Sequence, residues 1–237
     1  MGKNLTSQKR GKGSSRYRAP SFRYPGKVKH RSYDKDLAVG KVKDIIHSPA
    51  HYAPLAVVAF EDKKQTLMIS PEGLKVGEKV EIGEKAKVDA GNILPLNRIP
   101  DGTAVYNIEG APGDGGKFVR SSGGFARVTG KTQKGVSILL PSKKQRLFNP
   151  MCRAAIGIVA GSGRKEKPLL KAGKAHHKKK ARNKLYPITS STSMNAVDHP
   201  FGGSRSSKKG IPTASGKHAP PGAKVGSISP RRSGKRK

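Results

Sequence analysis

The sequence is poor in acidic residues, aromatic residues and cysteine. Its 237 residues include 15 Asp and Glu, 5% aromatic residues, no Trp and one Cys. The single thiol, Cys152, excludes an internal disulfide and a zinc site built on several cysteines. The longest apolar run, 55–60, is far short of the roughly 20 residues that span a bilayer. We therefore expect no membrane partner. The first residues also lack the apolar core of a signal peptide, so a cytoplasmic location is expected.

Basic residues, in contrast, are abundant. Lys and Arg number 49, which gives a formal net charge of +34. Repulsion among so many like charges opposes compaction unless a polyanion neutralises them. Nucleic acid is the polyanion that fits best, because its dense phosphates release condensed counterions when a basic protein binds. Hydrophobic residues make up only 33% of the chain, so part of it is expected to lack a core of its own.

Residues 1–36 are expected to form a basic N-terminal extension. Basic residues alternate there with small and aromatic residues, without a helical or strand period. Such a segment is expected to be disordered on its own. A flexible solubilising tail is one interpretation, but RNA binding is favoured, because bases stack on aromatic rings while cations meet phosphates. The candidate RNA-binding residues are Arg10, Arg16, Arg18, Arg23 and Lys27.

The middle of the chain has the pattern of short β-strands. Turn residues separate apolar runs at 39–46, 55–60, 67–69 and 76–82. This spacing predicts a small all-β barrel over residues 37–87. Glycine-rich turns divide a second series of runs at 93–94, 104–106, 118–119, 125–128, 136–140 and 156–159. We predict a second barrel over residues 88–160, and the fold class is all-β.

Residues 161–237 return to low complexity and are expected to form a basic C-terminal extension. No acidic residue occurs from Gly202 onward, and Lys and Arg stand among Gly, Ser and Pro. RNA would supply both the surface and the countercharge that this segment lacks. The candidate RNA-binding residues are Lys174, His176, Lys179, Arg182, Asn195, His199, Arg205, Arg231 and Arg232.

Three patterns that could carry chemistry are weak. The glycine-rich run from Gly110 to Lys117 departs from the Walker pattern, and a hairpin lying against RNA backbone is the favoured interpretation. His47 and His51 are four residues apart but have no cluster of cysteines or carboxylates beside them, so we expect no metal site. Cys152 reads as a small buried hydrophobe, although a catalytic pairing with His199 stays open.

Several ordered motifs resemble a known family. They are Gly91 to Leu96, Ile99 to Thr103, Pro112 to Lys117, Arg120 to Gly123, Cys152 to Ala154, Lys171 to Ala175 and Met194 to Gly203. In this order they resemble the universal family of large-subunit ribosomal protein two, over almost the whole chain. The stretches 171–182 and 219–226 resemble its archaeal and eukaryotic branch, and we expect an archaeal-like member. Within these motifs the candidate RNA-binding residues are Lys117, Arg120 and Arg153.

The resemblance implies an OB-fold barrel followed by an SH3-like barrel, with long basic extensions that have no globular fold. It implies a primary binder of large-subunit rRNA near the peptidyl-transferase centre that supports subunit association. Partners would be large-subunit rRNA, neighbouring ribosomal proteins and the small subunit. The family's Asp-His-Pro loop would comprise Asn195, Asp198, His199, Pro200, Gly202 and Gly203. No catalytic residue and no cofactor are expected, apart from Mg²⁺ that belongs to the surrounding rRNA.

Two other classes of protein remain as alternatives. An architectural DNA-binding protein would share the charge, but would not explain two barrels between extensions rich in Arg and aromatic residues. An acyl-transfer enzyme would use His199 and Cys152. The favoured hypothesis is a structural rRNA-binding protein of the large subunit.

Overall fold

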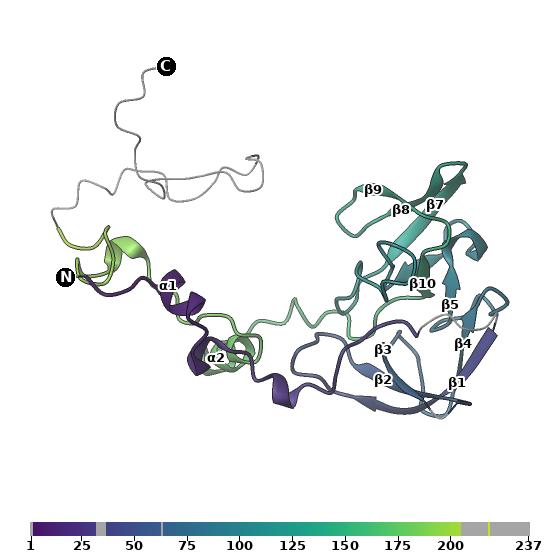
Figure 1. Ribbon diagram of the computed structural model, residues 1–237, viewed down its shortest axis with the longest axis horizontal. Helices are drawn as coiled ribbons and strands as arrows, with labels where there is room; N and C mark the ends of the chain where they lie inside the picture. Colours follow the sequence, from purple (N-terminus) through teal and green to yellow (C-terminus); the bar gives the residue numbers. More distant parts are fainter. Residues whose placement is uncertain (1, 32–36, 63, 205–217, 219–237) are drawn as a thin grey trace, which may run out of the picture. The chain divides into compact units, whose positions relative to one another are not determined.

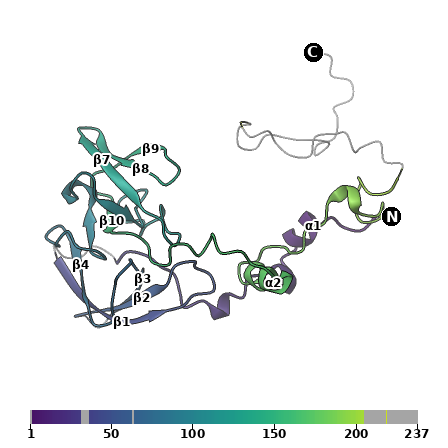
Figure 2. The same cartoon turned by 180° about the vertical axis from the view of Figure 1, so that it is seen from behind.

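The computed structural model describes residues 2–31, 37–62, 64–204 and 218, and its chain divides into two compact units. One unit spans residues 19–182, and the other combines residues 1–18 with residues 183–237. Figures 1 and 2 show the β-strands of the first unit from opposite sides.

Ten strands of unit 19–182 follow one another along a single sheet. Their bounds are β1 (Leu37–Ile46), β2 (Leu55–Phe60), β3 (Gln65–Ile69), β4 (Lys79–Gly83), β5 (Ile93–Pro95), β6 (Ala104–Tyr106), β7 (Ala126–Thr132), β8 (Gly135–Leu139), β9 (Gln145–Phe148) and β10 (Arg153–Ile156). The spatial order is β3-β2-β1-β4-β5-β10-β6-β7-β8-β9. All pairings are antiparallel except β4 with β5, where Ile82 faces Ile93.

Buried apolar side chains divide this sheet into two halves, each with its own core. Along β2 the buried positions Leu55, Val58 and Phe60 point into one core, which also takes side chains from β1, β3 and β4. A second core collects Leu94, Val105, Val128 and other apolar side chains from β5 to β10. The two cores and the strand order confirm the all-β class, with an OB-fold domain followed by an SH3-like domain.

Tyr106 ties the two halves together. It belongs to β6, yet its ring is packed in the first core and is 1% exposed. Its hydroxyl donates a hydrogen bond of 3.1 Å to the Ile69 carbonyl oxygen at the end of β3. Burial raises the pKa of this phenol well above its ordinary value, so it remains a neutral donor.

Part of the predicted N-terminal extension lies against the barrels. Residues 19–31 belong to unit 19–182. Val28 is packed in the first core, and His30 is 6% exposed. The His30 amide donates to the Gly115 carbonyl oxygen at 3.0 Å. Sequence patterning missed this contact because an isolated valine and histidine among cations have no strand or helix period.

Helices are few and short. Unit 19–182 contains η2 (Ser21–Arg23), η3 (Leu96–Arg98) and α2 (Ala172–Lys180), and the other unit contains α1 (Thr6–Gly11), η1 (Ser15–Tyr17) and η4 (Ser191–Ser193). Helix α2 was not expected, because none of its residues is buried and no apolar stripe marks it. Ala and Lys favour helix, and the cations of Lys178 to Lys180 in its last turn complement the helix dipole.

Three details of the strand prediction were wrong. The run 156–159 was expected to be a strand, but β10 ends at Ile156 and Val159 forms only an isolated bridge with Pro71. Phe118 and Val119 form no strand, and only an isolated bridge joins Phe118 to Ile108. Strand β9 was missed because Phe148 is its only buried residue, so it has no alternating pattern. It is held instead by antiparallel pairing with β8, in which Val136 lies opposite Phe148.

Candidate nucleic-acid interface

Basic side chains gather around Tyr52, in the loop between β1 and β2. The Arg182 guanidinium carbon lies 3.5 Å from the centre of the Tyr52 ring, a close cation–π contact. Arg164 and Lys178 lie 5.8 and 5.9 Å from the same ring. An Arg164 Nη1 also donates to the Tyr52 carbonyl oxygen. Tyr52 therefore holds cations from two parts of the predicted C-terminal extension against the first barrel.

A cavity of about 340 Å³ opens beside this cluster. Its lining residues are His47, Pro49, Arg164, Lys167, Pro168, Leu169, Lys174, Lys178, Ala181 and Arg182. Five of them are Lys or Arg, and none is Asp or Glu. We name this cavity the cationic pocket. Such a set of donors suits an anion with several oxygens, because Arg and Lys both bond phosphate oxygens.

The segment that carries most of these cations is held by few contacts. The Tyr24 hydroxyl donates a hydrogen bond of 2.5 Å to the Ala181 carbonyl oxygen. On α2 itself, Lys174, His176 and Lys179 are exposed, as expected for residues that meet an external partner. Arg182 is half-buried, with its guanidinium on Tyr52 rather than in open solvent.

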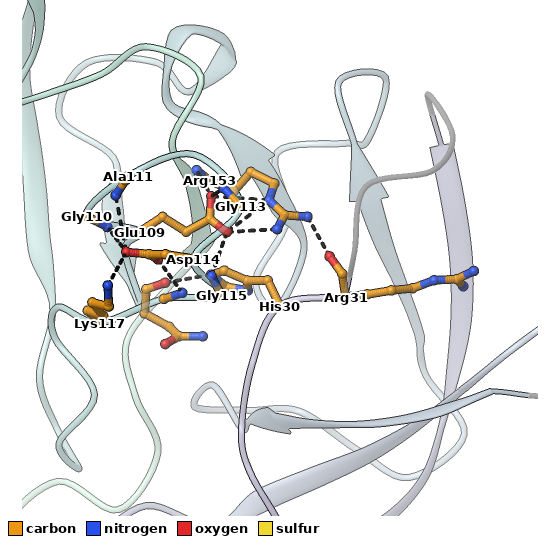
Figure 3. A network of polar contacts seen from close by, with 12 residues as sticks. His30, Arg31, Glu109, Gly110, Ala111, Gly113, Asp114, Gly115, Lys117 and Arg153 are labelled. Carbon is orange, nitrogen blue, oxygen red and sulfur yellow. Dashed lines mark hydrogen bonds and ion pairs between the residues drawn. The ribbon is translucent and has the colours of Figure 1, made fainter.

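A second group of charges is internal and lies between the N-terminal segment and the second barrel (Figure 3). Arg153, at the start of β10, is 3% exposed. Its Nη2 donates to Glu109 Oε1 at 2.7 Å, and its Nη1 donates to the Arg31 carbonyl oxygen at 2.6 Å. Glu109 is 0% exposed and also accepts from the Arg153 and Gly115 amides. We name the group of His30, Arg31, Glu109 and Arg153 the clasp.

The clasp fixes the protonation of its members. His30 Nε2 lies 2.6 Å from the Asn107 carbonyl oxygen and must donate to it, which leaves the buried Nδ1 bare. Burial, reinforced by the nearby positive charge of Arg153, lowers the pKa of His30 to about 4. Burial alone would raise the pKa of Glu109, but hydrogen bonds and charge from Arg153 outweigh it and lower that pKa. The clasp is thus a neutral imidazole beside a buried ion pair.

Arg153 was predicted to bind RNA, and its position argues for an internal role instead. The guanidinium is surrounded by Glu109 and backbone, so little of its surface is left for a partner. Arg120 is similar but half-buried. It donates to the carbonyl oxygens of Gly116 and Val28 at 3.1 and 3.0 Å. Both arginines therefore connect the N-terminal segment to the second barrel.

The glycine-rich loop 110–116 is closed by its own carboxylate. Asp114 accepts from the amides of Gly110, Ala111 and Gly116 at 3.0 to 3.2 Å. Lys117 Nζ lies 3.0 Å from Asp114 Oδ2. Since these amides already bond a carboxylate, they cannot also cradle a phosphate, which agrees with the rejection of a nucleotide loop. Lys117 is exposed, so it can still reach a partner beyond Asp114.

The Asp-His-Pro loop belongs to the unit of residues 1–18 and 183–237. His199 Nδ1 accepts a 3.0 Å hydrogen bond from the Phe201 amide, and the two rings meet edge to face at 5.1 Å. Because Nδ1 is an acceptor, the neutral imidazole carries its proton on Nε2. Asp198 does not orient the ring in this arrangement. It forms an ion pair of 3.2 Å with Lys3.

Backbone bonds shape the same loop. The His199 amide donates to the Asn195 carbonyl oxygen, and the Gly202 amide donates to that of His199. A Cβ at Gly202 would lie 2.2 Å from the Asn195 carbonyl oxygen, so only glycine fits there. Gly203 has a φ of 84°, which favours glycine as well. Asn195 and Pro200 are exposed at the loop surface.

The remaining predicted residues lie either on the surface or outside the residues that the structure describes. Arg10, Arg16, Arg18, Arg23 and Lys27 are exposed, and Arg18 Nε donates to the Gly13 carbonyl oxygen. Arg205, Arg231 and Arg232 lie outside the described residues. Sequence reasoning did not select Tyr52, Arg164 or Lys167. For Arg164 and Lys167, the signal that could have found them is the absence of acidic residues around 164–182 apart from Glu166.

Other kinds of site find little support. Within the part of the chain that the structure describes, no group of three or more His, Cys, Asp or Glu residues is placed to hold a metal ion. Over the same residues, no helix is long and apolar enough to cross a membrane. Cys152 is 0% exposed, and burial together with the charge of Glu109 raises its thiol pKa. A buried, protonated thiol is a poor nucleophile.

Comparison with known proteins decides the family. The profile described as "Ribosomal Proteins L2, RNA binding N-terminal domain" matches residues 2–82, and "Ribosomal Proteins L2, C-terminal domain" matches residues 89–222. The chain belongs to the ribosomal protein L2 family. Similar proteins named large ribosomal subunit protein uL2 occur in Methanothermobacter thermautotrophicus, 51% identical over 242 residues, and in Methanococcus aeolicus, 48% identical over 240 residues. Each alignment covers all of both chains.

Membership in the L2 family confirms the resemblance stated from the motifs, including the archaeal branch. It makes the chain a large-subunit ribosomal protein with an RNA-binding N-terminal domain. One family profile ends at residue 82 and the other begins at residue 89. This boundary coincides with the connection between β4, which ends at Gly83, and β5, which begins at Ile93. The cationic pocket and the Asp-His-Pro loop are the parts of the described surface whose chemistry best suits contact with RNA.

Proposed function

We propose that this L2-family protein is a primary binder of large-subunit rRNA that braces the RNA near the peptidyl-transferase centre and supports association with the small subunit. It would act in the cytoplasm within the ribosome, beside neighbouring ribosomal proteins, and without a cofactor other than Mg²⁺ of the rRNA. The observation that carries this proposal is the separation of its charges. Among the described residues, the cations around Tyr52 and on α2 form no ion pair with a carboxylate, whereas the cation at Arg153 has one.

The RNA contacts would be mainly contacts to phosphate. Exposed Lys174, His176 and Lys179 lie on one short helix, and the cations of the pocket lie beside it. Arg10, Arg16, Arg18, Arg23 and Lys27 would extend the contact from the N-terminal side, and Lys117 from the second barrel. Phosphate contacts fix register and orientation more than they read sequence, which suits a protein that braces a folded RNA.

The Asp-His-Pro loop would position RNA rather than transfer protons. With Nδ1 bonded to the Phe201 amide, His199 offers Nε2–H as a hydrogen-bond donor. A donor can hold an RNA phosphate, ribose or base in place. A general base would need a free lone pair at the position that faces its substrate. Asn195 and Pro200 at the loop surface would share in this contact.

The two rival functions receive less support. An acyl-transfer enzyme would need an accessible thiolate, but Cys152 is buried with a raised thiol pKa. An architectural DNA-binding protein is disfavoured by membership in the L2 family. Neither rival accounts for an extension that is fixed to the first barrel by Tyr52.

The test is binding of the purified full-length protein to a large-subunit rRNA transcript, with duplex DNA of equal length as the control. We expect preference for the RNA and a steep loss of affinity with salt. A protein that neutralises about 6–10 phosphates loses roughly 10³–10⁵ in affinity between about 50 and 200 mM salt. Equal affinity for duplex DNA, or a nearly flat salt dependence, would contradict the proposal. Co-sedimentation with large subunits at moderate salt gives an independent check.

A further inference from the structure

The cationic pocket brings like charges together without an internal partner. Arg164, Lys167, Lys174, Lys178 and Arg182 all line it. Among the described residues, none of these five takes part in an ion pair with a carboxylate, in contrast to Arg31, Lys117 and Arg153. All five belong to the segment 164–182, so their mutual repulsion opposes the arrangement that gathers residues 164–169 and α2 around one pocket. A force of the opposite sign is needed to keep them together.

The contacts inside the protein supply only part of that force. Tyr52 provides its ring to Arg182 and its carbonyl oxygen to Arg164. Tyr24 adds one hydrogen bond to Ala181. No residue of α2 is buried, so the helix brings no apolar surface that would fix it to the barrel. The arrangement is one that an anion in the pocket would complete.

We propose that the cationic pocket is the seat of a phosphodiester group of RNA, and that its occupation fixes residues 164–182 against the first barrel. This inference rests on the proposed function, because RNA is the source of the phosphodiester. It adds a defined site and a consequence, namely that binding at one phosphate orders the junction between the barrels and the basic segment that follows them.

The shape of the pocket fits this ligand. Its volume of about 340 Å³ is at the small end of ligand pockets, which measure about 300–1,000 Å³. Pro49, Pro168 and Leu169 form apolar wall, which a ribose ring can contact while the phosphate meets the cations. His47 completes the lining from the β1–β2 loop and can donate one more hydrogen bond. A phosphodiester with its sugar would satisfy both kinds of wall.

The experiment uses the full-length protein and a short probe. The probe is the tetranucleotide rArArArA, and its analogue with an uncharged methylphosphonate backbone is the ligand control. Binding is measured by calorimetry at low salt, and hydrogen exchange of the amides of α2 (Ala172–Lys180) reports whether the segment becomes fixed. We expect the tetranucleotide to bind and to slow exchange in α2, and the uncharged analogue to do neither.

The test variant is Lys167→Gln combined with Lys174→Gln. Both side chains line the pocket. The cations placed over the Tyr52 ring belong to other residues, Arg164, Lys165, Lys178 and Arg182, so those contacts stay intact. We expect affinity for the tetranucleotide to fall about tenfold or more, since hydrogen bonds between charged groups are stronger than those between neutral groups. The slowing of exchange in α2 should disappear. The matched control, Lys134→Gln with Lys144→Gln, removes the same charge from exposed positions of the second barrel. It should retain both the affinity for the tetranucleotide and the slowing of exchange in α2.

Binding to the rRNA transcript separates failure of this inference from failure of the proposed function. If the wild-type protein does not prefer the transcript to duplex DNA, the proposed function fails. If it does, but Lys167→Gln with Lys174→Gln leaves tetranucleotide affinity and α2 exchange unchanged, the pocket is not a phosphate site. The same result follows if the methylphosphonate analogue slows exchange as well as the tetranucleotide does. For the rRNA transcript, each lost phosphate contact should reduce the salt slope by about 1.

Discussion

The clasp and the cationic pocket use the same residue types in opposite ways. In the clasp, Arg153 is buried against Glu109, and the pair is surrounded by backbone donors and acceptors. In the pocket, Arg164 and Arg182 rest on the Tyr52 backbone and ring, with no carboxylate in the lining. One cluster is complete within the protein. The other requires a negative charge from outside.

This difference teaches how to sort cations in a very basic protein. A buried cation is tolerated only when a counter-charge and hydrogen bonds offset its lost hydration. Arg153 meets that requirement internally, so it stabilises the joint between the N-terminal segment and the second barrel. The pocket cations keep partial access to water, and none of the residues that line the pocket with them is Asp or Glu. The position of the nearest carboxylate, rather than the density of Lys and Arg, separates structural cations from binding cations.

Removing the carboxylate of the clasp should have the largest effect on the stability of the protein. Glu109→Gln keeps the size of the side chain but leaves the Arg153 guanidinium buried without a counter-charge. Breaking a buried ion pair from one side costs about 3–5 kcal/mol, so we expect the free energy of unfolding to fall by about that amount. Urea unfolding followed by circular dichroism at neutral pH measures it.

The control for this change is Glu166→Gln, which removes the same charge from an exposed position. We expect the control to change the free energy of unfolding by less than about 0.5 kcal/mol, as surface substitutions usually do. A loss of less than about 1 kcal/mol in Glu109→Gln would mean that the clasp does not hold the N-terminal segment in place.

Acid should weaken the clasp. His30 has its folded-state pKa lowered from 6.5 to about 4. The stability that its neutral form provides is complete above about pH 6.5 and is lost as the pH falls toward 4, because only the unfolded chain binds the proton there. At about 1.36 kcal/mol per pKa unit, the loss reaches roughly 3 kcal/mol. Urea unfolding at pH values between about 7 and 4 tests this.

The variant His30→Gln isolates the contribution of that imidazole. Its amide can still donate to the Asn107 carbonyl oxygen, but it does not titrate. We expect a smaller dependence of the unfolding free energy on pH between about 6.5 and 4. Some dependence should remain, because burial and the charges of Arg120 and Arg182 also lower the pKa of His51. A pH dependence identical to that of the wild type would show that His30 is not buried as a neutral base.

The contrast between the two clusters also marks how far sequence alone could lead. The barrels were predictable, because runs such as Leu55 to Phe60 alternate buried and less buried positions. The clasp was not, because Glu109 and Arg153 are 44 residues apart and only the pairing of β10 with β5 and β6 sets Arg153 beside Glu109. Helix α2 escaped prediction because it buries no face. The Asp-His-Pro motif was found, but not the Phe201 amide that orients His199.

A smaller effect is expected when the platform of the pocket is removed. Tyr52→Leu keeps a smaller apolar side chain at this position but eliminates the cation–π contact with Arg182. A cation–π contact contributes about 0.5–1 kcal/mol at exposed sites, so global stability should fall by about that amount at most. Hydrogen exchange in α2 should become faster in the free protein, because Arg182 loses its partner. Unchanged exchange in α2 would show that Tyr52 does not hold the segment.

The Tyr52 prediction has a matched control in Phe125, an exposed aromatic residue with Arg127 at 5.7 Å from its ring. Phe125→Leu removes a similar contact at the other barrel. It should change stability by a comparable amount without affecting exchange in α2. Acceleration in both variants would indicate a general loosening rather than a local one.

The smallest effect is expected for the chemical step of peptide-bond formation in ribosomes that carry His199→Ala. In this protein His199 Nδ1 accepts from the Phe201 amide, so Nε2–H is a donor and the ring has no lone pair to offer as a base. Loss of a general base would slow the step by about 10²–10⁴, whereas loss of a positioning donor should change it by less than tenfold and should reduce assembly or subunit association first. His199→Asn is the matched variant, because its side-chain oxygen can still accept from the Phe201 amide and preserve the loop. Single-turnover peptide-bond formation on purified, fully assembled subunits decides the matter. A hundredfold slower step in His199→Ala, with normal assembly and normal binding of tRNA, would overturn the assignment of His199 to positioning.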